Sequence, residues 1–364
     1  MLSRRALNRA TLERQMLLRR SNIPTFEAIE RLVGLQAQTT QSWYLGLWSR
    51  LEDFKPEELG RMLLERKVVR IALMRSTIHL VTSRDCLSLR ALVQPVIERS
   101  TKGVFGRHWV GLDEAAVKAA GRKLVEERPR TFTELGNLLA KQWPGRNAEA
   151  LAQAMRAWLP LVQVPPRGVW GASGPAAHTT VEEWLGRRLL VKPSLEKMIM
   201  RYLAAFGPAT VMDIQTWSGM TRLAEIVERM RAKLVTFRNE GGRELFDVPE
   251  AARPGADAPA PPRFLYDYDN LLLSYADRTR VITDGYHKQG FRIDGPMPCI
   301  LLVDGFTNGT WKIARERARA TLIVQPFKRL SRKDSNAVTA EGYRLLSFAA
   351  AGTATHDVKL MAPN

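Results

Sequence analysis

The expected architecture follows from one segment, Val68-Val-Arg-Ile-Ala-Leu-Met-Arg-Ser-Thr-Ile-His-Leu-Val-Thr82. Two runs rich in β-branched residues flank Met74-Arg75-Ser76, which is typical of two short strands joined by a turn. Apolar residues spaced three or four apart precede the segment, and Pro56 stands where proline is tolerated at the start of a helix. Helices followed by a two-stranded ribbon predict a winged helix.

Helical patterns fill most of the chain before this ribbon. Residues 4–20 place Leu7, Leu12 and Met16 near one stripe and arginines around the rest, which predicts an amphipathic helix with a strongly positive face. Asn22-Ile-Pro24 ends that pattern, and Thr25 opens a second helix. A third helix is expected from about Trp43 to Leu51.

The order of helices and then a ribbon recurs twice, and such repetition is stronger evidence than any single instance. The second set has helices at 113–127, from 131 and at 148–159, then a ribbon at 161–171 with its turn at Pro166-Arg167-Gly168. The third set has helices at 195–206, 209–220 and 222–232, then a ribbon at 234–248. Gly241-Gly242 in that ribbon would supply the positive φ angles of a tight turn.

Beyond a Pro- and Ala-rich linker at 251–262, the pattern changes to short strands at 299–303, 310–313 and 321–324. Asp304-Gly305 and Asn308-Gly309 are turn signals between them, and a helix around 339–348 closes the chain. We therefore predict a mainly helical α+β protein, with three tandem winged-helix motifs in a concave arrangement and a C-terminal β-rich domain. The predicted divisions are 1–84, 85–180, 181–250 and 251–364.

The charge of the chain narrows the class of partner. Lys and Arg number 55 against 37 Asp and Glu, which gives a formal net charge of +18. This balance favours a protein that binds nucleic acid over an ordinary metabolic enzyme, although a basic solvated surface is the alternative. Binding to an anionic membrane lacks a hydrophobic insertion face beside the charge.

The cysteines and the hydropathy pattern predict the compartment. Only Cys86 and Cys299 occur, and neither belongs to a closely spaced Cys or His set, so we expect no zinc site and no disulfide framework. The first residues lack the apolar core of a signal peptide, and no apolar run approaches the ~18 residues that span a bilayer. We expect a cytoplasmic, nucleoid-associated monomer.

The candidate catalytic stretch is Gly34-Leu-Gln-Ala-Gln-Thr-Thr-Gln-Ser-Trp-Tyr44, which carries uncharged polar side chains between two apolar helical patterns. If this turn is extended, Gln36 and Gln38 share a face, whereas on a helix they would diverge. The chain has no Gly-rich phosphate loop, His-Glu-x-x-His or Gly-x-Ser-x-Gly motif. The two glutamines are therefore the best candidates for chemistry.

Several other residues each allow two interpretations. Arg75, Arg167 and Arg238 lie at or beside ribbon turns, where they would reach DNA phosphates or be merely solvated. His79 alternates with apolar neighbours, so it faces a cleft or pairs with a backbone carbonyl.

Two further clusters also stay open. Tyr266-Asp-Tyr-Asp-Asn270 would ligate a cation or act as a base, or it joins domains through carboxylates paired with arginines. Arg315, Arg317 and Arg319 form one positive face if extended, which suits a nucleic-acid contact or a strand edge protected from aggregation.

Taken together, these motifs resemble the AlkZ family of winged-helix DNA glycosylases over nearly the whole chain. The resemblance is carried by Leu35-Gln-Ala-Gln38, Leu7-Asn-Arg-Ala-Thr11, Arg75-Ser-Thr-Ile-His79, Pro165-Pro-Arg-Gly-Val-Trp-Gly171 and Tyr268-Asp-Asn-Leu-Leu-Leu-Ser274. The chain looks most similar to the branch of AlkZ itself, linked to self-resistance against azinomycin B, and more distant from the YcaQ group, which has Asp where this chain has Gln38.

The resemblance implies a monofunctional glycosylase without metal or cofactor. It would cleave the N-glycosidic bond of N7-alkylated purines in duplex DNA and unhook interstrand crosslinks, and its catalytic residues would be Gln36 and Gln38. Thr39, beside them, joins the expected DNA contacts. The alternative function is that of a non-catalytic winged-helix protein, either a transcriptional regulator or a factor that sequesters damaged DNA.

Overall fold

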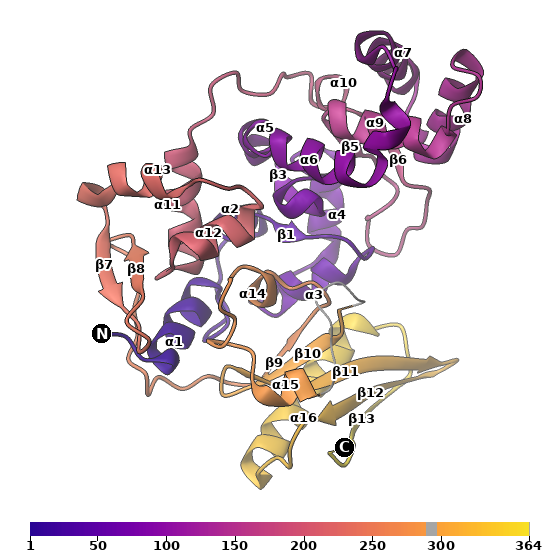
Figure 1. Ribbon diagram of the computed structural model, residues 1–364. Coiled ribbons are helices and arrows are strands. Elements are labelled where there is room, and N and C mark those ends of the chain that lie inside the picture. Colours follow the sequence, from indigo (N-terminus) through magenta and orange to yellow (C-terminus); the bar gives the residue numbers. More distant parts are fainter. Residues whose placement is uncertain (289–296, 364) are drawn as a thin grey trace.

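A computed structural model gives the fold of residues 1–288 and 297–363 (Figure 1). The first half of the chain contains α1 (Arg4–Arg14), α2 (Thr25–Arg31), β1 (Leu35–Gln36), α3 (Ser42–Trp48), α4 (Pro56–Leu64), β2 (Val68–Ala72), the 3₁₀ turn η1 (Met74–Ser76), β3 (Ile78–Thr82), α5 (Ser83–Leu92), α6 (Gln94–Phe105), η2 (Gly106–Trp109), α7 (Glu114–Glu127), β4 (Arg130–Thr131), α8 (Phe132–Gln142) and α9 (Ala148–Trp158). The second half contains β5 (Leu161–Gln163), β6 (Ala177–Thr180), α10 (Val181–Leu185), α11 (Leu195–Phe206), α12 (Val211–Ser218), α13 (Ala224–Arg229), η3 (Arg231–Lys233), β7 (Val235–Arg238), β8 (Glu244–Asp247), β9 (Arg263–Leu265), α14 (Asn270–Leu273), α15 (Asp284–Lys288), β10 (Cys299–Val303), β11 (Phe306–Glu316), β12 (Arg319–Pro326), α16 (Arg332–Ala349) and β13 (Thr355–Leu360).

The first predicted ribbon is confirmed. Strands β2 and β3 pair antiparallel from Val68 opposite Thr82 to Ala72 opposite Ile78. The short strand β1 adds to the outer edge of β3, and β5, β6 and β4 continue the sheet beyond β2. Strands from the first and second helical units therefore share one six-stranded sheet, while the predicted unit boundaries stay predictions.

The second predicted ribbon is wrong in its pairing. Strand β5 pairs with β6 at 177–180, and not with the residues that follow Pro166. Prolines at 165 and 166 cannot donate hydrogen bonds to a sheet, so the chain leaves the sheet there. The excursion packs on the first unit, where the Tyr44 hydroxyl donates to Gly168 O at 2.9 Å and accepts from the Trp170 N–H at 3.1 Å.

The third ribbon is a hairpin, as predicted. Its strands pair from Val235 opposite Asp247 to Arg238 opposite Glu244. Only the second glycine of the predicted turn, Gly242, has a positive φ, of 74°. The hairpin lies at the left of Figure 1, beside the N-terminus.

The C-terminal domain is a five-stranded sheet of order β13-β12-β11-β10-β9, in which α16 crosses from β12 to the parallel strand β13. The predicted turn at Asp304-Gly305 is confirmed by φ angles of 50° and 81°. The predicted turn at Asn308-Gly309 is wrong, because β11 runs through both residues. Gly309 serves close strand approach instead, since a Cβ there would lie 2.7 Å from Gln325 O.

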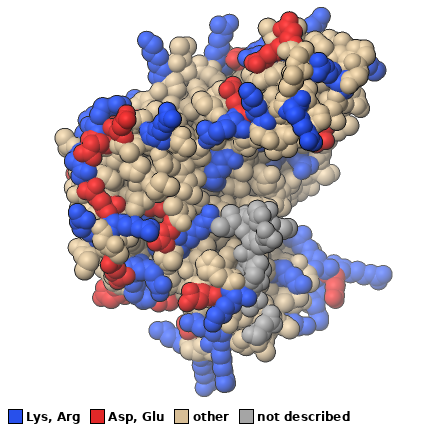
Figure 2. Space-filling view, in the orientation of Figure 1, with Lys and Arg blue, Asp and Glu red and all other residues tan. Residues whose placement is uncertain are grey.

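The predicted positive strand face of three arginines is also wrong. Arg315 is the next-to-last residue of β11, Arg319 begins β12 opposite Glu316, and Arg317 lies in the turn between the strands. All three side chains are exposed, and their places at the strand ends and in the turn put them at the tip of the β11–β12 hairpin. This tip projects at the lower right of the molecule, where Figure 2 shows a cluster of Lys and Arg side chains.

The N-terminal helix corrects another expectation. Helix α1 ends at Arg14, and its arginines do not form a solvated face, because Arg9 is fully buried. Arg5 and Arg9 bind Asp304 of the C-terminal domain, and both terminal nitrogens of Arg14 donate to Asp247 at 2.7 and 2.8 Å. The hydropathy pattern of this helix is amphipathic, but carboxylates from distant parts of the chain bind its arginines.

The molecule has a hollow on one side. Figure 2 shows it opening at the right, between the lobe of α7 to α9 above and the C-terminal sheet below, and the segment from β1 to α3 reaches its edge. Over the described ranges, no helix combines the length and apolar character that crossing a lipid bilayer requires. Within the same ranges, no group of three His, Cys, Asp or Glu side chains could hold a metal ion.

Candidate active site

The Gln36-Ala37-Gln38 segment starts in strand β1, and its backbone stays bonded to β3 as far as Ala37. Gln36 pairs with His79 across the sheet, and the Ala37 N–H donates to Ile78 O at 2.7 Å. Gly34 permits this close approach, because its φ is +87° and a Cβ there would lie 2.5 Å from a methyl carbon of Val81. The segment is therefore fixed as the edge strand of the first ribbon.

The two amides differ in exposure. Gln36 is only 3% exposed, and its Oε1 accepts a hydrogen bond from Nη2 of Arg75 at 2.7 Å. Gln38 is exposed, and its Oε1 accepts a longer bond of 3.3 Å from the Ile78 N–H. Thr39 is exposed beside it. The site thus offers one enclosed and one open amide.

The backbone of the segment is held by residues outside the predicted catalytic pair and the predicted DNA contacts. Arg70 donates to Ala37 O at 2.9 Å, and the Tyr266 hydroxyl donates to Gln36 O at 3.1 Å. Asn270 donates to Gly34 O at 2.7 Å, and the Gln41 amide donates to Val169 O and Ala172 O at 3.0 and 2.9 Å. A charged Arg70 inside the apolar strand Val68–Ala72 was the one local signal of such a role.

Arg70 adds an unusual charge beneath the segment. It is 2% exposed, and no ion pair of the described residues involves it. Burial lowers its pKa to about 10, with a smaller contribution from the positive charge of Arg167. Gly168 leaves room for it, since a Cβ there would lie 2.9 Å from Cδ of Arg70.

The acidic and aromatic cluster at 266–270 has a structural role. Asp269 and Arg50 form a buried bidentate pair, with N to O distances of 2.7 and 2.9 Å. Together with the hydroxyl of Tyr266 and the amide of Asn270, the pair ties the C-terminal domain to the first unit beside Gln36. The prediction that this segment joins domains through paired carboxylates is confirmed for Asp269.

His79 also follows its structural interpretation. It is fully buried, with Nδ1 at 3.0 Å from Thr77 O, and Nε2 has no hydrogen-bond partner among the residues that the structure describes. Burial, together with a smaller effect of the Arg75 charge, lowers its pKa to about 3. His79 is therefore neutral at ordinary pH and does not serve as a proton donor.

We expect His79 to make the protein acid-sensitive. Its pKa is about 3 when folded and 6.5 in the reference state, so between these values the unfolded chain binds the extra proton. The contribution of His79 is fully present above about pH 6.5 and is lost as the pH falls, by about 1.4 kcal/mol per pH unit. Urea unfolding at pH 7, 6 and 5 should show a shallower pH dependence for His79→Gln than for the wild type. Equal pH dependence in the two proteins would contradict the assignment.

The predicted wing arginines are scattered. The guanidinium of Arg75 turns inward, where it donates to Gln36 Oε1 and to Trp217 O, so the expectation of an exposed tip is wrong. Arg167 is half-buried and donates to Gly174 O at 3.1 Å. Arg238 is exposed on β7, at the side of Figure 1 opposite the hollow. Of the DNA contacts predicted from the sequence, the structure brings Arg75 and His79 next to Gln36.

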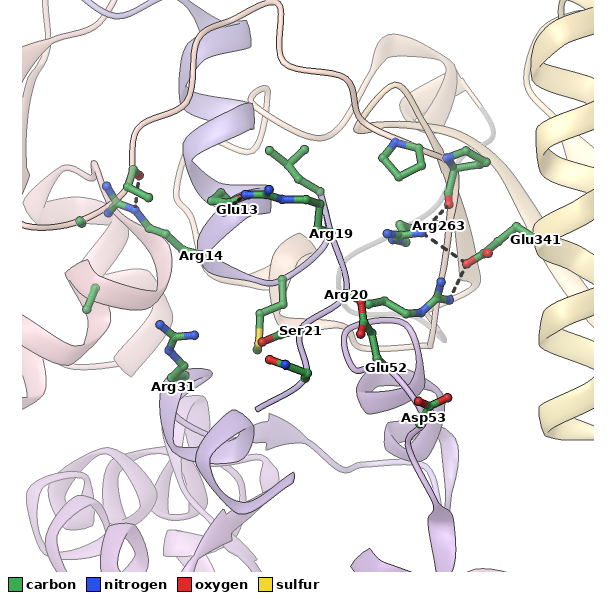
Figure 3. A pocket seen from close by; sticks show the side chains of 18 of the residues that line it. Glu13, Arg14, Arg19, Arg20, Ser21, Arg31, Glu52, Asp53, Arg263 and Glu341 are labelled. Atoms are coloured by element: carbon green, nitrogen blue, oxygen red, sulfur yellow. Dashed lines mark hydrogen bonds and ion pairs between the residues drawn. The ribbon is translucent and has the colours of Figure 1, made fainter. Parts of the chain in front are cut away.

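A separate cavity of about 1510 Å³ lies beside α1, α2 and α16 (Figure 3). Its wall carries arginines and carboxylates that bind one another, as Arg20 and Arg263 do at Glu341, with N to O distances of 2.6 and 3.5 Å. Gln36 and Gln38 do not line it. Because its charges are largely paired internally, we place the candidate active site at the two glutamines instead.

Comparisons with known proteins identify the class of protein to which this chain belongs. The fold matches the solved structure of the Streptomyces sahachiroi DNA glycosylase AlkZ, with a TM-score of 0.76, 22% identity, and coverage of 99% of this chain and 100% of that chain. A family model described as DNA glycosylase AlkZ-like matches residues 29–348. The chain belongs to this family and is a DNA glycosylase, which confirms the resemblance seen in the motifs. A Streptomyces sahachiroi protein named interstrand DNA cross-link repair glycosylase is 24% identical over 354 residues, which cover 91% of this chain and 92% of the relative.

Proposed function

We propose that this DNA glycosylase hydrolyses the N-glycosidic bond of N7-alkylated purines in duplex DNA, with Gln36 and Gln38 at the reacting centre. The observation that carries the proposal is the fixed pair of amides. Donors of a single ribbon, the Arg75 guanidinium and the Ile78 N–H, hold the two side-chain carbonyls. The hydrogen bonds of these two side chains with the described residues include no carboxylate.

Two amides suffice if the leaving base is already charged. A purine alkylated at N7 is cationic, so when its bond to C1′ breaks the electron pair neutralises the base, and no general acid is required. The remaining tasks are to place a water at C1′ and to stabilise an oxocarbenium-like sugar. An amide oxygen has two lone pairs, so Gln38 Oε1 has one left for a proton of that water and presents its negative end to the developing cation. The proton of the water is released to solvent after attack.

We extend the proposal to interstrand crosslinks. A base tied to the opposite strand cannot readily rotate into a closed pocket, as most glycosylases require. Gln38 and Thr39 are exposed where the β1 to α3 segment reaches the edge of the hollow, which supports attack on the lesion in place. The 24% identical relative is named interstrand DNA cross-link repair glycosylase, which also supports this substrate. A complex with the lesion fully extruded into a closed pocket would contradict the extension.

The basic hairpin tip supports binding to the DNA backbone. Arg315, Arg317 and Arg319 are exposed on the projection below the hollow, and a cationic tip of this kind suits phosphate contacts. We propose that the protein binds a single duplex as a monomer and that Thr39 and Arg167 also approach the DNA. Arg238 lies on the opposite side of the view and is the weakest of the proposed contacts.

The decisive experiment follows abasic sites in a duplex that carries one N7-methylguanine. Gln36→Ala and Gln38→Ala are each expected to lower the single-turnover rate by about 100-fold or more, since loss of one pre-organised polar group commonly has that effect. The affinity for the duplex should stay close to that of the wild type. Alkaline cleavage of abasic sites measures the rate, and fluorescence anisotropy measures binding.

Gln142→Ala is the matched control, because Gln142 is exposed at the end of α8. It should leave both the rate and the affinity unchanged. Binding by the wild type without abasic sites would favour the alternative of a factor that sequesters damage, and unaltered excision by both active-site variants would move the reacting centre elsewhere.

A further inference from the structure

The turn that carries Arg75 is strained. Arg75 and Ser76 are consecutive non-glycine residues with φ angles of 56° and 59°. Left-handed backbone is unfavourable for residues with a Cβ, and it persists only where the surroundings enforce it. Such strain is concentrated at functional sites. This turn is also the one whose side chain reaches Gln36.

Elements of the other two helical units hold the turn in place. Arg156 of α9 donates to the carbonyl oxygen of Ser76 and, at 3.2 Å, to its hydroxyl. On the other side, Arg75 Nη1 donates to Trp217 O of α12 at 2.6 Å. Gly219 packs against the backbone of the turn, since a Cβ there would lie 3.2 Å from both N and Cα of Arg75. Three parts of the chain therefore determine where this guanidinium lies.

The charge of Arg75 is not neutralised by a neighbouring acid. None of the ion pairs among the described residues involves it, although its guanidinium turns away from solvent. Loss of solvent around the guanidinium, together with a smaller effect of the Arg278 charge, lowers its pKa to about 10. A half-buried cation whose acceptors are an amide oxygen and a main-chain oxygen, with no carboxylate, is an unusual arrangement for stability alone. Among the described residues, its one side-chain hydrogen-bond partner is Gln36.

The bond to Arg75 fixes which way the Gln36 amide faces. A guanidinium has donors only, so it must meet the carbonyl oxygen, and the amide nitrogen then points away from it. That nitrogen donates to no described residue, yet it is not among the buried unpaired atoms, so it retains contact with solvent. A charge-assisted bond at the oxygen polarises the amide and strengthens its N–H groups as donors.

We propose that Arg75 is a positioning residue of the excision reaction. It locks the Gln36 amide with its NH₂ group toward the substrate, so that Gln36 acts as a hydrogen-bond donor to the lesion nucleotide while Gln38 supplies the acceptor for water. This division of labour rests on the proposed function of the two glutamines. Contacts with α9 and α12 fix the strained turn, and the turn fixes the position of the Arg75 guanidinium.

Two substitutions that leave the turn intact test the division of labour. Gln36→Glu keeps an acceptor but loses the NH₂ donor, so its single-turnover rate on N7-methylguanine DNA should fall about 10- to 100-fold, close to that of Gln36→Ala. Gln38→Glu keeps its acceptor, so it should retain at least about tenfold more activity than Gln36→Glu. Wild-type activity in Gln36→Glu, or its loss in Gln38→Glu, would overturn the assignment.

A double-mutant cycle tests Arg75 itself. Arg75→Met should lower the single-turnover rate about 10- to 100-fold without weakening binding of lesion DNA, and it should add nothing to Gln36→Ala. Arg75→Lys, which keeps a donor, should recover part of the rate. Multiplicative effects of the two changes in folded protein would show that Arg75 acts independently of Gln36 and would overturn the proposal.

The controls separate the two proposals. Thermal unfolding of every variant identifies loss of fold, and if Arg75→Met does not fold, the two glutamate variants decide. A wild-type protein that forms no abasic sites refutes the proposed function and this inference with it. An active wild type with the contrary variant results refutes the inference alone.

Discussion

Replacing Asp269 with alanine is expected to lower the free energy of unfolding by about 3–5 kcal/mol, because it breaks a buried ion pair by removing one partner. Asp269 is fully buried and Arg50 is 1% exposed. The carboxylate accepts two bonds from Arg50, whose Nη1 otherwise donates, within the described part of the chain, to Gly46 O and the Ser49 hydroxyl. The variant leaves a guanidinium buried without its counterion.

Urea unfolding at pH 7 measures this loss. Glu228→Ala removes an exposed carboxylate from Arg231 and serves as the control, in which little change is expected. The double variant Arg50→Met/Asp269→Leu should recover most of the stability, because apolar replacement of a whole buried pair is often neutral or favourable. A loss below about 1 kcal/mol in Asp269→Ala would show that solvent reaches Arg50 and would refute the argument.

The same substitution should also reach the active site. Asp269 lies between Tyr266 and Asn270, which donate to the main-chain oxygens of Gln36 and Gly34. Tyr266 packs its ring against Gly46, where a Cβ would lie 2.6 Å from the ring. The C-terminal domain therefore supports the candidate catalytic segment from behind, and loosening this joint would lower excision even in protein that stays folded.

Local signals predicted those parts of the fold that local contacts determine. The ribbon of β2 and β3 and the hairpin of β7 and β8 join neighbours in sequence, and both are confirmed. The partner of β5 lies beyond a Pro-containing excursion, so no local pattern could identify it. The turn at Arg317-Ala318 lacks the Gly, Pro or Asn residues that signal turns, and the arginines beside it were therefore assigned to one strand.

The candidate site shows the same division. Gln36 and Gln38 were visible in the sequence as polar residues between apolar helical patterns, and the extended conformation is confirmed at Gln36, which lies in β1. Their supports come from β2, from the strained turn and from residues 266–270, more than 200 positions away. Two successive non-glycine residues with positive φ leave no signature in sequence, which is why Arg75 was expected outside and lies inside.

Excision of an uncharged, unmodified purine is expected to be slower than that of N7-methylguanine by at least about 10²- to 10⁴-fold, the usual contribution of general acid catalysis. A neutral base leaves as an anion unless it is protonated, and the residues in contact with Gln36 and Gln38 supply no suitable acid. His79 is neutral because burial lowers its pKa to about 3. Burial raises the pKa of Tyr266 well above its ordinary value, and the pKa of Arg75 is about 10.

Because none of these three groups changes protonation between about pH 5 and pH 9, the single-turnover rate on N7-methylguanine should be flat across that range. Duplexes that differ only in the target base, N7-methylguanine or adenine, measure the discrimination, and a rate profile from pH 5.5 to 8.5 measures the flatness. An acidic limb near pH 6 would require a general base, and comparable excision of adenine would require a general acid. Either result would show that proton transfer drives the reaction. If two fixed amides act on a leaving group that is already cationic, the pH profile should be flat and the discrimination between the two bases strong.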